Sequence, residues 1–425
     1  MMPATLRRLV PPAYRSVLSD RTFRRLLLGF AVSYLGDGMS FVAVAWLAIE
    51  LAPRSTAGLW VGGAVAAYTL PGLVGALVFG RRLRRAPARR LLFADSVVRG
   101  VFLGAVPLAW LAGQLTLPLY VVLLAVSSML HAWGNAGQYT LLAELLPDEQ
   151  RLAANTVVGS LTFAATIAGP AIAGVLVTYA GSALVIGLDA LTYAFLAVVV
   201  ARLRLPEAAH TEAAHTEAAH TEAAHTEAAH GGFALLRSHP ELLGLLTLTW
   251  FFNLLYGPVE VALPLHVTGD LHAPGTLLGV YWMMFGVGAV FGGLAVGALR
   301  QLPLWPVTVG IVAGWGLALM PFGLDVPVAV TLACFTLGGA IYGPFGALSV
   351  TLMQAKSPPR HLAAMLAARS AVLLTASPLG TALGGPLTTA LGPRATLGGS
   401  GLATVALGAV AGVLLLVRRG RSGPR

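Results

Sequence analysis

About twelve apolar segments, each long enough to cross a bilayer as a helix, run through this chain of 425 residues. A spanning helix needs about 20 apolar residues, and helices keep all their backbone hydrogen bonds within one segment. Charged residues make up only 10% of the chain, whereas soluble domains carry about 25%. The sequence therefore predicts an all-α polytopic membrane protein. The expected segments are 24–51, 58–80, 91–112, 117–143, 152–179, 182–202, 241–266, 275–299, 304–323, 326–352, 362–390 and 395–417.

Basic residues gather in alternate loops between these segments. Of the 27 Lys and Arg residues, only Arg54 and Arg394 fall in loops assigned to the outside. Cytoplasmic loops carry such an excess of Lys and Arg, so both termini are expected in the cytoplasm. The formal charge of +10 is thereby explained by orientation in the membrane, and no nucleic-acid partner is predicted.

A polar repeat, Glu-Ala-Ala-His-Thr, interrupts the apolar pattern near the middle of the chain and contains five histidines between His210 and His230. A period of five steps about 140° around an α-helix, so successive histidines do not share a face. We interpret the repeat as a linker and predict no metal site.

The second half echoes the first: Gly62, Gly75 and Gly80 recur at one constant spacing as Gly279, Gly292 and Gly297. Two repeated halves with a substrate site at their interface are typical of transporters. The expected parts are a cytoplasmic arm 1–22, a six-helix half 23–205, a linker 206–238, a six-helix half 239–417 and a basic tail 418–425.

Three carboxyl groups are expected inside the membrane: Asp37, Asp189 and Glu260. Ionisable groups at that depth are costly and are functional candidates by default. Asp37 is the strongest candidate for proton coupling. The alternatives are an Asp37 held by backbone donors at a glycine kink and a Glu260 near the outer interface. The neighbouring polar and aromatic candidates for substrate contact are Asn253, Trp250 and Tyr281.

Asp95 and Arg99 stand four residues apart, the spacing of a charge pair on one helix face. We expect a structural or gating pair there. In the fifth segment, Gly169, Pro170 and Gly174 predict a kinked helix that packs closely against a neighbour.

The sequence resembles the major facilitator superfamily over nearly its whole length, and within it the bacterial drug-exporter branch that includes macrolide efflux proteins and siderophore exporters. Four motifs carry the resemblance. They are Ser33-x-Leu35-Gly36-Asp37-Gly38, Ala94-Asp95 with Arg99, Leu152-Ala-Ala-Asn155 followed by Gly169-Pro170-x-x-Ala173-Gly174, and Leu263-Pro264. The Gly-Pro signature in helix five implies an antiporter, with Ala173 departing from the family's glycine.

The loop after the second segment matches the family pattern at Gly80, Arg85, Arg89 and Arg90. Arg84 stands where the family has aspartate, and Pro87 stands where it has glycine. The resemblance therefore implies a cytoplasmic gate that lacks its acidic partner.

We expect a secondary active transporter that exports a lipophilic or amphipathic small molecule, such as a drug, in exchange for protons by alternating access. The alternatives are an uptake carrier or facilitator for a metabolite, and a siderophore exporter. No phosphate-binding loop, nucleophile motif, zinc spacing or dinucleotide fingerprint is present in the sequence, so neither an enzyme nor a cofactor is predicted. A monomer in a bacterial-type cytoplasmic membrane suffices for this architecture.

Overall fold

The computed structural model describes residues 12–83, 86–203, 239–296, 302–357 and 362–421. Those residues form helices and short connections, with no strand among them. Eleven helical stretches in the described part are long and apolar enough to cross a membrane. The predicted segment 362–390 coincides with α18 (Leu362–Leu391). The all-α polytopic class is confirmed.

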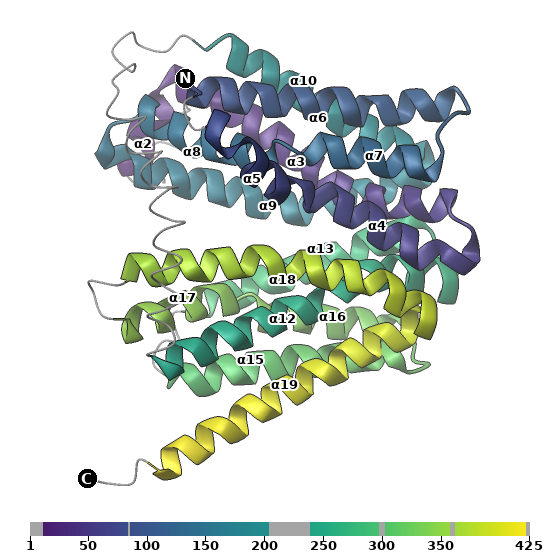
Figure 1. Cartoon of the computed structure of the whole chain (residues 1–425), viewed down its shortest axis with the longest axis vertical. Helices are drawn as coiled ribbons and strands as arrows, with labels where there is room; N and C mark the ends of the chain where they lie inside the picture. Colours follow the sequence, from purple (N-terminus) through teal and green to yellow (C-terminus); the bar gives the residue numbers. More distant parts are fainter. Residues whose placement is uncertain (1–11, 84–85, 204–238, 297–301, 358–361, 422–425) are drawn as a thin grey trace. The chain divides into compact units, whose positions relative to one another are not determined.

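The chain divides into two compact units, one made of residues 1–47 and 67–221 and the other of residues 48–66 and 222–425. The end of α3 and the first part of α4 thus pack with the second unit. The first half of the chain, through residue 203, contains nine α-helices among its described residues (Figure 1). They are α2 (Pro12–Ser19), α3 (Arg21–Leu51), α4 (Ala57–Thr69), α5 (Pro71–Leu83), α6 (Ala88–Leu111), α7 (Leu117–Ser128), α8 (His131–Leu145), α9 (Asp148–Ala180) and α10 (Ser182–Ala201).

The second unit is built from α12 (Pro240–Leu265), a π-helical turn η3 (His266–Asp270), α13 (Gly275–Leu294), α15 (Leu304–Leu319), η4 (Met320–Gly323), α16 (Val328–Tyr342), α17 (Phe345–Lys356), α18 and α19 (Pro393–Arg421). Five aromatic rings from α12, α13, α15 and α16 pack together, with centroid distances between 5.2 and 6.4 Å. They belong to Tyr256, Phe285, Trp315, Phe335 and Tyr342.

Three segments expected as single helices are each divided in two: α4 with α5, α7 with α8, and α16 with α17. Pro71 begins α5, and Pro344 precedes α17. Proline has no N–H and clashes with the preceding turn, so a helix restarts there more readily than it continues. α9, by contrast, is one helix through Pro170.

The core of the first unit joins α3, α8, α9 and α10. Leu26 and Phe30 of α3, Leu141 of α8, Ala154 of α9 and Leu196 of α10 are all buried in one cluster. Side chains of α3 that recur every three to four residues thus face the core, as expected for a helix covered on that side.

One pair of the repeated glycines, Gly75 and Gly292, makes similar close contacts in the two units. A Cβ atom on Gly75 would lie 1.8 Å from the carbonyl oxygen of Met129, and one on Gly292 would lie 1.9 Å from that of Ala340. Each glycine therefore permits a backbone approach that no other residue allows. Close packing accounts for the presence of glycine at both positions.

Candidate functional site

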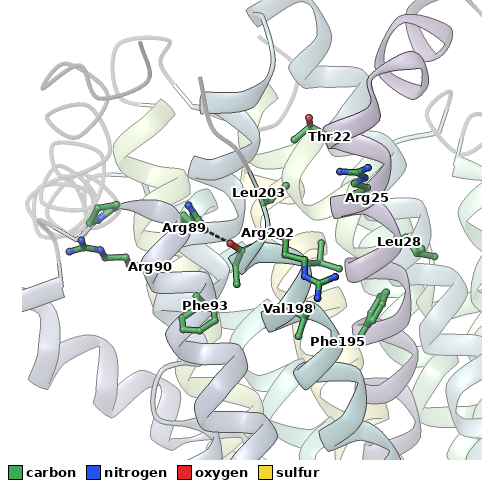
Figure 2. Close-up of a pocket in the computed structure, with 13 residues that line it drawn as sticks. Thr22, Arg25, Leu28, Arg89, Arg90, Phe93, Phe195, Val198, Arg202 and Leu203 are labelled. Atoms are coloured by element: carbon green, nitrogen blue, oxygen red, sulfur yellow. Dashed lines mark hydrogen bonds between the residues drawn. The ribbon is translucent and has the colours of Figure 1, made fainter. Parts of the chain in front are cut away.

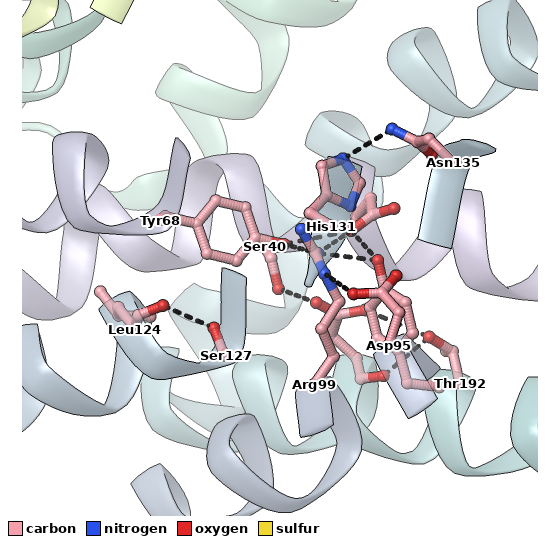
Figure 3. A network of polar contacts seen from close by, with 12 residues as sticks. Ser40, Tyr68, Asp95, Arg99, Leu124, Ser127, His131, Asn135 and Thr192 are labelled. Atoms are coloured by element: carbon pink, nitrogen blue, oxygen red, sulfur yellow. Dashed lines mark hydrogen bonds and ion pairs between the residues drawn. The ribbon is translucent and has the colours of Figure 1, made fainter. Parts of the chain in front are cut away.

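Arg99 of α6 is the centre of a polar network inside the first unit (Figure 3). Only 2% of its side chain is exposed, and its Nη1 lies 3.1 Å from Oδ1 of Asp37 on α3. The Asp37 side chain is 31% exposed. An intramembrane arginine thus has a carboxylate partner from another helix, as a buried charge requires.

Two tyrosine hydroxyls complete the shell around this ion pair. Tyr193 of α10 donates to Asp37 Oδ1 at 2.6 Å and accepts from Arg99 Nη1 at 2.7 Å. Tyr68 of α4 donates to the same oxygen at 3.1 Å. The Arg99 guanidinium also lies 5.0 Å from the Tyr193 ring centroid and 5.3 Å from that of Tyr68, within the range of cation–π attraction.

Asp95 provides a second carboxylate for the same guanidinium, one helical turn away. Its Oδ1 lies 3.8 Å from Arg99 Nε, which is beyond hydrogen-bond distance. Neither atom has a hydrogen-bond partner among the described residues. The predicted pair is thus present as a near contact, while Asp37 is the closer partner.

Asp189 of α10 is fully buried in the same unit. Ser40 of α3 donates to its Oδ2 at 2.5 Å. The Thr192 hydroxyl lies 3.1 Å from Asp189 Oδ1 and 2.7 Å from the Asp189 carbonyl oxygen. Within the described part of the chain, no cation lies within ion-pair distance of this carboxyl group.

The fifth predicted segment approaches this network through its glycine. A Cβ atom on Gly169 would lie 2.5 Å from the Cα of Gly38, so α9 and α3 pack with their backbones in contact beside Asp37. The Gly174 carbonyl accepts a hydrogen bond of 2.8 Å from Thr178 within α9. Asn155, near the start of α9, is exposed.

In the second unit, Glu260 of α12 accepts a hydrogen bond of 2.9 Å from Thr381 of α18. Trp250, on the same helix, donates through Nε1 to Thr375 of α18 at 3.1 Å. Asn253 Nδ2 donates to a carbonyl within α12 at 2.8 Å. These three predicted residues therefore lie on α12, and two of them join it to α18.

Tyr281 of α13 is fully buried, and its hydroxyl lies 2.6 Å from that of Thr331. Its ring packs edge-on against Phe335. This packing favours a structural role for Tyr281 over a substrate contact.

The structure describes only part of the loop motif that follows the second predicted segment. Arg89 donates through Nε to the Val200 carbonyl at 3.0 Å and also donates to the Ala201 carbonyl. It therefore provides hydrogen bonds to two carbonyl oxygens at the C-terminal end of α10. Arg90 is exposed, Gly80 lies within α5, and Arg85 lies outside the described residues. The histidine repeat also lies outside them. The described residues contain no group of three or more metal-ligating side chains.

Sequence reasoning did not assign Ser40, Thr192 or Tyr193 to the site. The signal was their spacing: Ser40 follows Asp37 by one helical turn, and Thr192 and Tyr193 follow Asp189 by one turn. Residues three and four apart share a helix face. Which helices bring those faces together could not be read from spacing alone.

A multi-pass helical protein with partnered charges in its spanning segments is typical of membrane transporters. The chain belongs to the Major Facilitator Superfamily, whose family model matches residues 26–372. This confirms the resemblance drawn from the motifs.

Two relatives match along most of their length. The chain is 27% identical over 398 residues to the multidrug efflux pump Tap of Mycobacterium tuberculosis, covering 91% of each protein. It is 26% identical over 383 residues to the MFS-type transporter y4rN of Sinorhizobium fredii, covering 88% of this chain and 90% of the relative.

Solved structures share the fold. A bacterial homologue of the iron transporter ferroportin, in an inward-facing state, matches with a TM-score of 0.67 at 16% identity, over 92% of this chain and 98% of that one. A bacterial homologue of the human lysosomal transporter Spinster matches with a TM-score of 0.69 at 11% identity, over 95% and 96%.

Proposed function

We propose that the protein is a proton-coupled exporter of a lipophilic or amphipathic small molecule, working by antiport. The observation that carries this proposal is that two carboxyl groups, Asp37 and Asp95, face the Arg99 guanidinium inside the first unit. A third, Asp189, is buried in the same unit without a cationic partner among the described residues. If Asp37, Asp95 and Asp189 were all ionised, the single charge of Arg99 would leave the cluster with a net charge of −2. Uncompensated charge in a medium of low dielectric is expensive, and carboxyl groups there take up protons instead.

The contacts of the Thr192 hydroxyl group support Asp189 as the carboxyl group that holds a proton. Thr192 has a single hydroxyl hydrogen, and its shorter contact is with the Asp189 carbonyl oxygen at 2.7 Å. With that hydrogen used, the 3.1 Å contact between Thr192 Oγ1 and Asp189 Oδ1 would bring two acceptors together. A proton on Asp189 turns this contact into a hydrogen bond.

Asp37 is the group whose protonation changes the network. Tyr68, Tyr193 and Arg99 all donate to its Oδ1, and hydrogen bonds donated to a carboxylate stabilise its ionised form. When Asp37 binds a proton, Arg99 loses its closest ionic partner. The unsatisfied Asp95 Oδ1, 3.8 Å from Arg99 Nε, then becomes the better partner.

This exchange of partners links a proton to movement of helices. Arg99 and Asp95 are both on α6, whereas Asp37 is on α3 and Tyr193 is on α10. With Arg99 on Asp37, the three helices are tied together. With Arg99 on Asp95, the tie is confined to α6, and α3 is free to shift against it.

Antiport follows if substrate and proton compete at Asp37. With Asp189 protonated, the cluster retains one negative charge, which a proton on Asp37 neutralises. One charge moving across about 100 mV provides about 2.3 kcal/mol. At 1.4 kcal/mol for each tenfold, one proton sustains a gradient of roughly 40-fold for a neutral substrate.

Export, rather than uptake, is supported by the Gly169-Pro170 signature of α9 and by the similarity to a protein named as a multidrug efflux pump. We place the chain as a monomer in a bacterial cytoplasmic membrane with both termini inside, on the distribution of basic residues. Its activity is transport and not catalysis. In the second half, Glu260, Asn253 and Trp250 are proposed to contribute to the substrate path.

The test is proton movement on addition of substrate to proteoliposomes, with a panel of macrolides, cationic dyes and catechol-type chelators. Asp37→Asn should abolish the proton signal. Asp325→Asn is the matched control, because Asp325 is 91% exposed and pairs with Arg394 outside the network. Substrate flux without a proton signal in the native protein would point to a facilitator, and accumulation with the proton gradient reversed would point to uptake.

A further inference from the structure

A groove of about 1500 Å³ lies on the first unit between α3, α6 and α10, away from the Arg99 network (Figure 2). Its lining is Thr22, Arg25, Leu28, Pro87, Arg89, Arg90, Phe93, Phe195, Val198, Val199, Ala201, Arg202 and Leu203. The loop motif and the antiport mechanism do not account for this groove.

Four arginines line the groove, and no acidic residue is among the described residues that line it. Arg89 is held in place by the Val200 and Ala201 carbonyls at the end of α10. Arg25, Arg90 and Arg202 are exposed, and their guanidinium groups make no hydrogen bond or ion pair to the described residues. The arginines therefore present uncompensated positive charge, which favours an anion.

The remainder of the groove is apolar and exposed. Leu28 is 57% exposed, Val198 is 46% exposed, and Phe93 and Phe195 are each 39% exposed. Along α10, Phe195 lies seven residues before Arg202, or about 10 Å at 1.5 Å per residue. The groove thus carries cationic donors at one end and apolar side chains a short way into the membrane.

We propose that this groove binds an anionic glycerophospholipid from the surrounding leaflet. Its phosphate would accept hydrogen bonds from Arg25 and Arg202, and an acyl chain would lie along Leu28 and Phe195. Basic pockets between transmembrane helices are suited to anionic headgroups, and guanidinium groups bind phosphate through paired donors. A soluble anion would leave the apolar end exposed, whereas a lipid covers both ends.

Arg89 connects two of the helices that form the groove. It lies in the first turn of α6 and donates to the last carbonyls of α10. Residues of α3 line the other side of the groove. A bound phospholipid would bridge the three helices that also supply Asp37, Arg99 and Tyr193, so the site can stabilise their arrangement without contacting the transported molecule.

The experiment is native mass spectrometry of the full chain with phosphatidylglycerol and with phosphatidylethanolamine of the same acyl composition. Phosphatidylglycerol should bind more tightly. The double variant Arg25→Ala/Arg202→Ala should weaken its binding by about thirty-fold, since each interfacial arginine contributes about a fivefold effect, and should remove the preference. If the Ala variant fails to fold, Arg25→Gln/Arg202→Gln is used for the same measurement.

The matched control is Arg21→Ala/Arg24→Ala, which removes the same charge from exposed positions at the start of α3 that do not line the groove. It should bind phosphatidylglycerol as the native chain does. Equal loss in both double variants would show general attraction to anionic lipid and overturn the site. Displacement of the lipid by inorganic phosphate would also overturn it, because the groove would then be an anion site alone.

Discussion

The same isosteric change, Asp to Asn, should destabilise the protein at Asp37 and leave its stability nearly unchanged at Asp189. Asp37→Asn removes a charge that three donors address. Asp189→Asn replaces a protonated carboxyl group with an amide of the same shape, whose oxygen can still accept from Ser40 and whose NH2 can donate to Thr192. The comparison therefore tests the protonation states on which the proposed mechanism depends.

The expected size of the effect follows from the hydrogen bonds. Three donors lie 2.6, 3.1 and 3.1 Å from Asp37 Oδ1. A bond to a charged group contributes about 1.5–3 kcal/mol and a neutral bond about 0.5–1.5 kcal/mol, so losing the charge costs about 3–4.5 kcal/mol over the three bonds before screening. Because the Asp37 side chain is 31% exposed, solvent screening reduces the expected cost to about 2 kcal/mol. Asp189→Asn should change the free energy of unfolding by less than about 0.5 kcal/mol.

The assay is reversible unfolding in mixed micelles for the native chain and both variants, joined to infrared spectroscopy. The native protein should show the C=O stretching band of a protonated carboxyl group, and Asp189→Asn should lose it. Equal destabilisation by the two variants, with no such band in the native protein, would refute the assignment of the proton to Asp189.

Two further substitutions test the packing and the network. Gly292→Ala must push α13 and α16 apart by at least about 1.1 Å, from 1.9 Å to the 3.0 Å limit for a Cβ contact, and should cost about 1–3 kcal/mol. Gly293→Ala, with nothing within 4 Å, should be tolerated; equal melting temperatures for the two would contradict the close approach. Tyr193→Phe removes hydrogen bonds of 2.6 and 2.7 Å and should cost about 1–3 kcal/mol. Tyr179→Phe, at a residue that is 84% exposed, should cost nothing measurable in the same unfolding assay.

Much of the fold follows from hydropathy, because a chain segment inside the bilayer has few ways to form hydrogen bonds with all its backbone N–H and C=O groups. The expected segments agree with the helices to within a few residues, and the repeated Gly75 and Gly292 have equivalent contacts. The helix interruptions at Pro71 and Pro344 were not predicted. Each lies within a continuous apolar segment, where neighbouring helices can satisfy the backbone groups that the interruption frees. Proline alone does not decide the matter, because α9 continues through Pro170.

The site was predicted as residues but not as a network. Asp37, Asp95, Arg99 and Asp189 stand out because charges are rare in spanning segments. Which of these side chains contact one another depends on how α3, α6 and α10 are rotated about their axes. The sequence does not specify that rotation, because most faces of a membrane helix are apolar. The closest partner of Arg99 therefore proved to be Asp37 on another helix, rather than Asp95 on its own.

The central claim is that proton binding at Asp37 is coupled to substrate movement. The most direct measurement is substrate accumulation in proteoliposomes under an imposed proton gradient, for the native chain, Asp37→Asn and Asp325→Asn. We predict a concentration gradient of up to roughly 40-fold at about 100 mV for the native chain and for Asp325→Asn, and mere equilibration for Asp37→Asn. Accumulation by Asp37→Asn equal to that of the native chain would contradict the account.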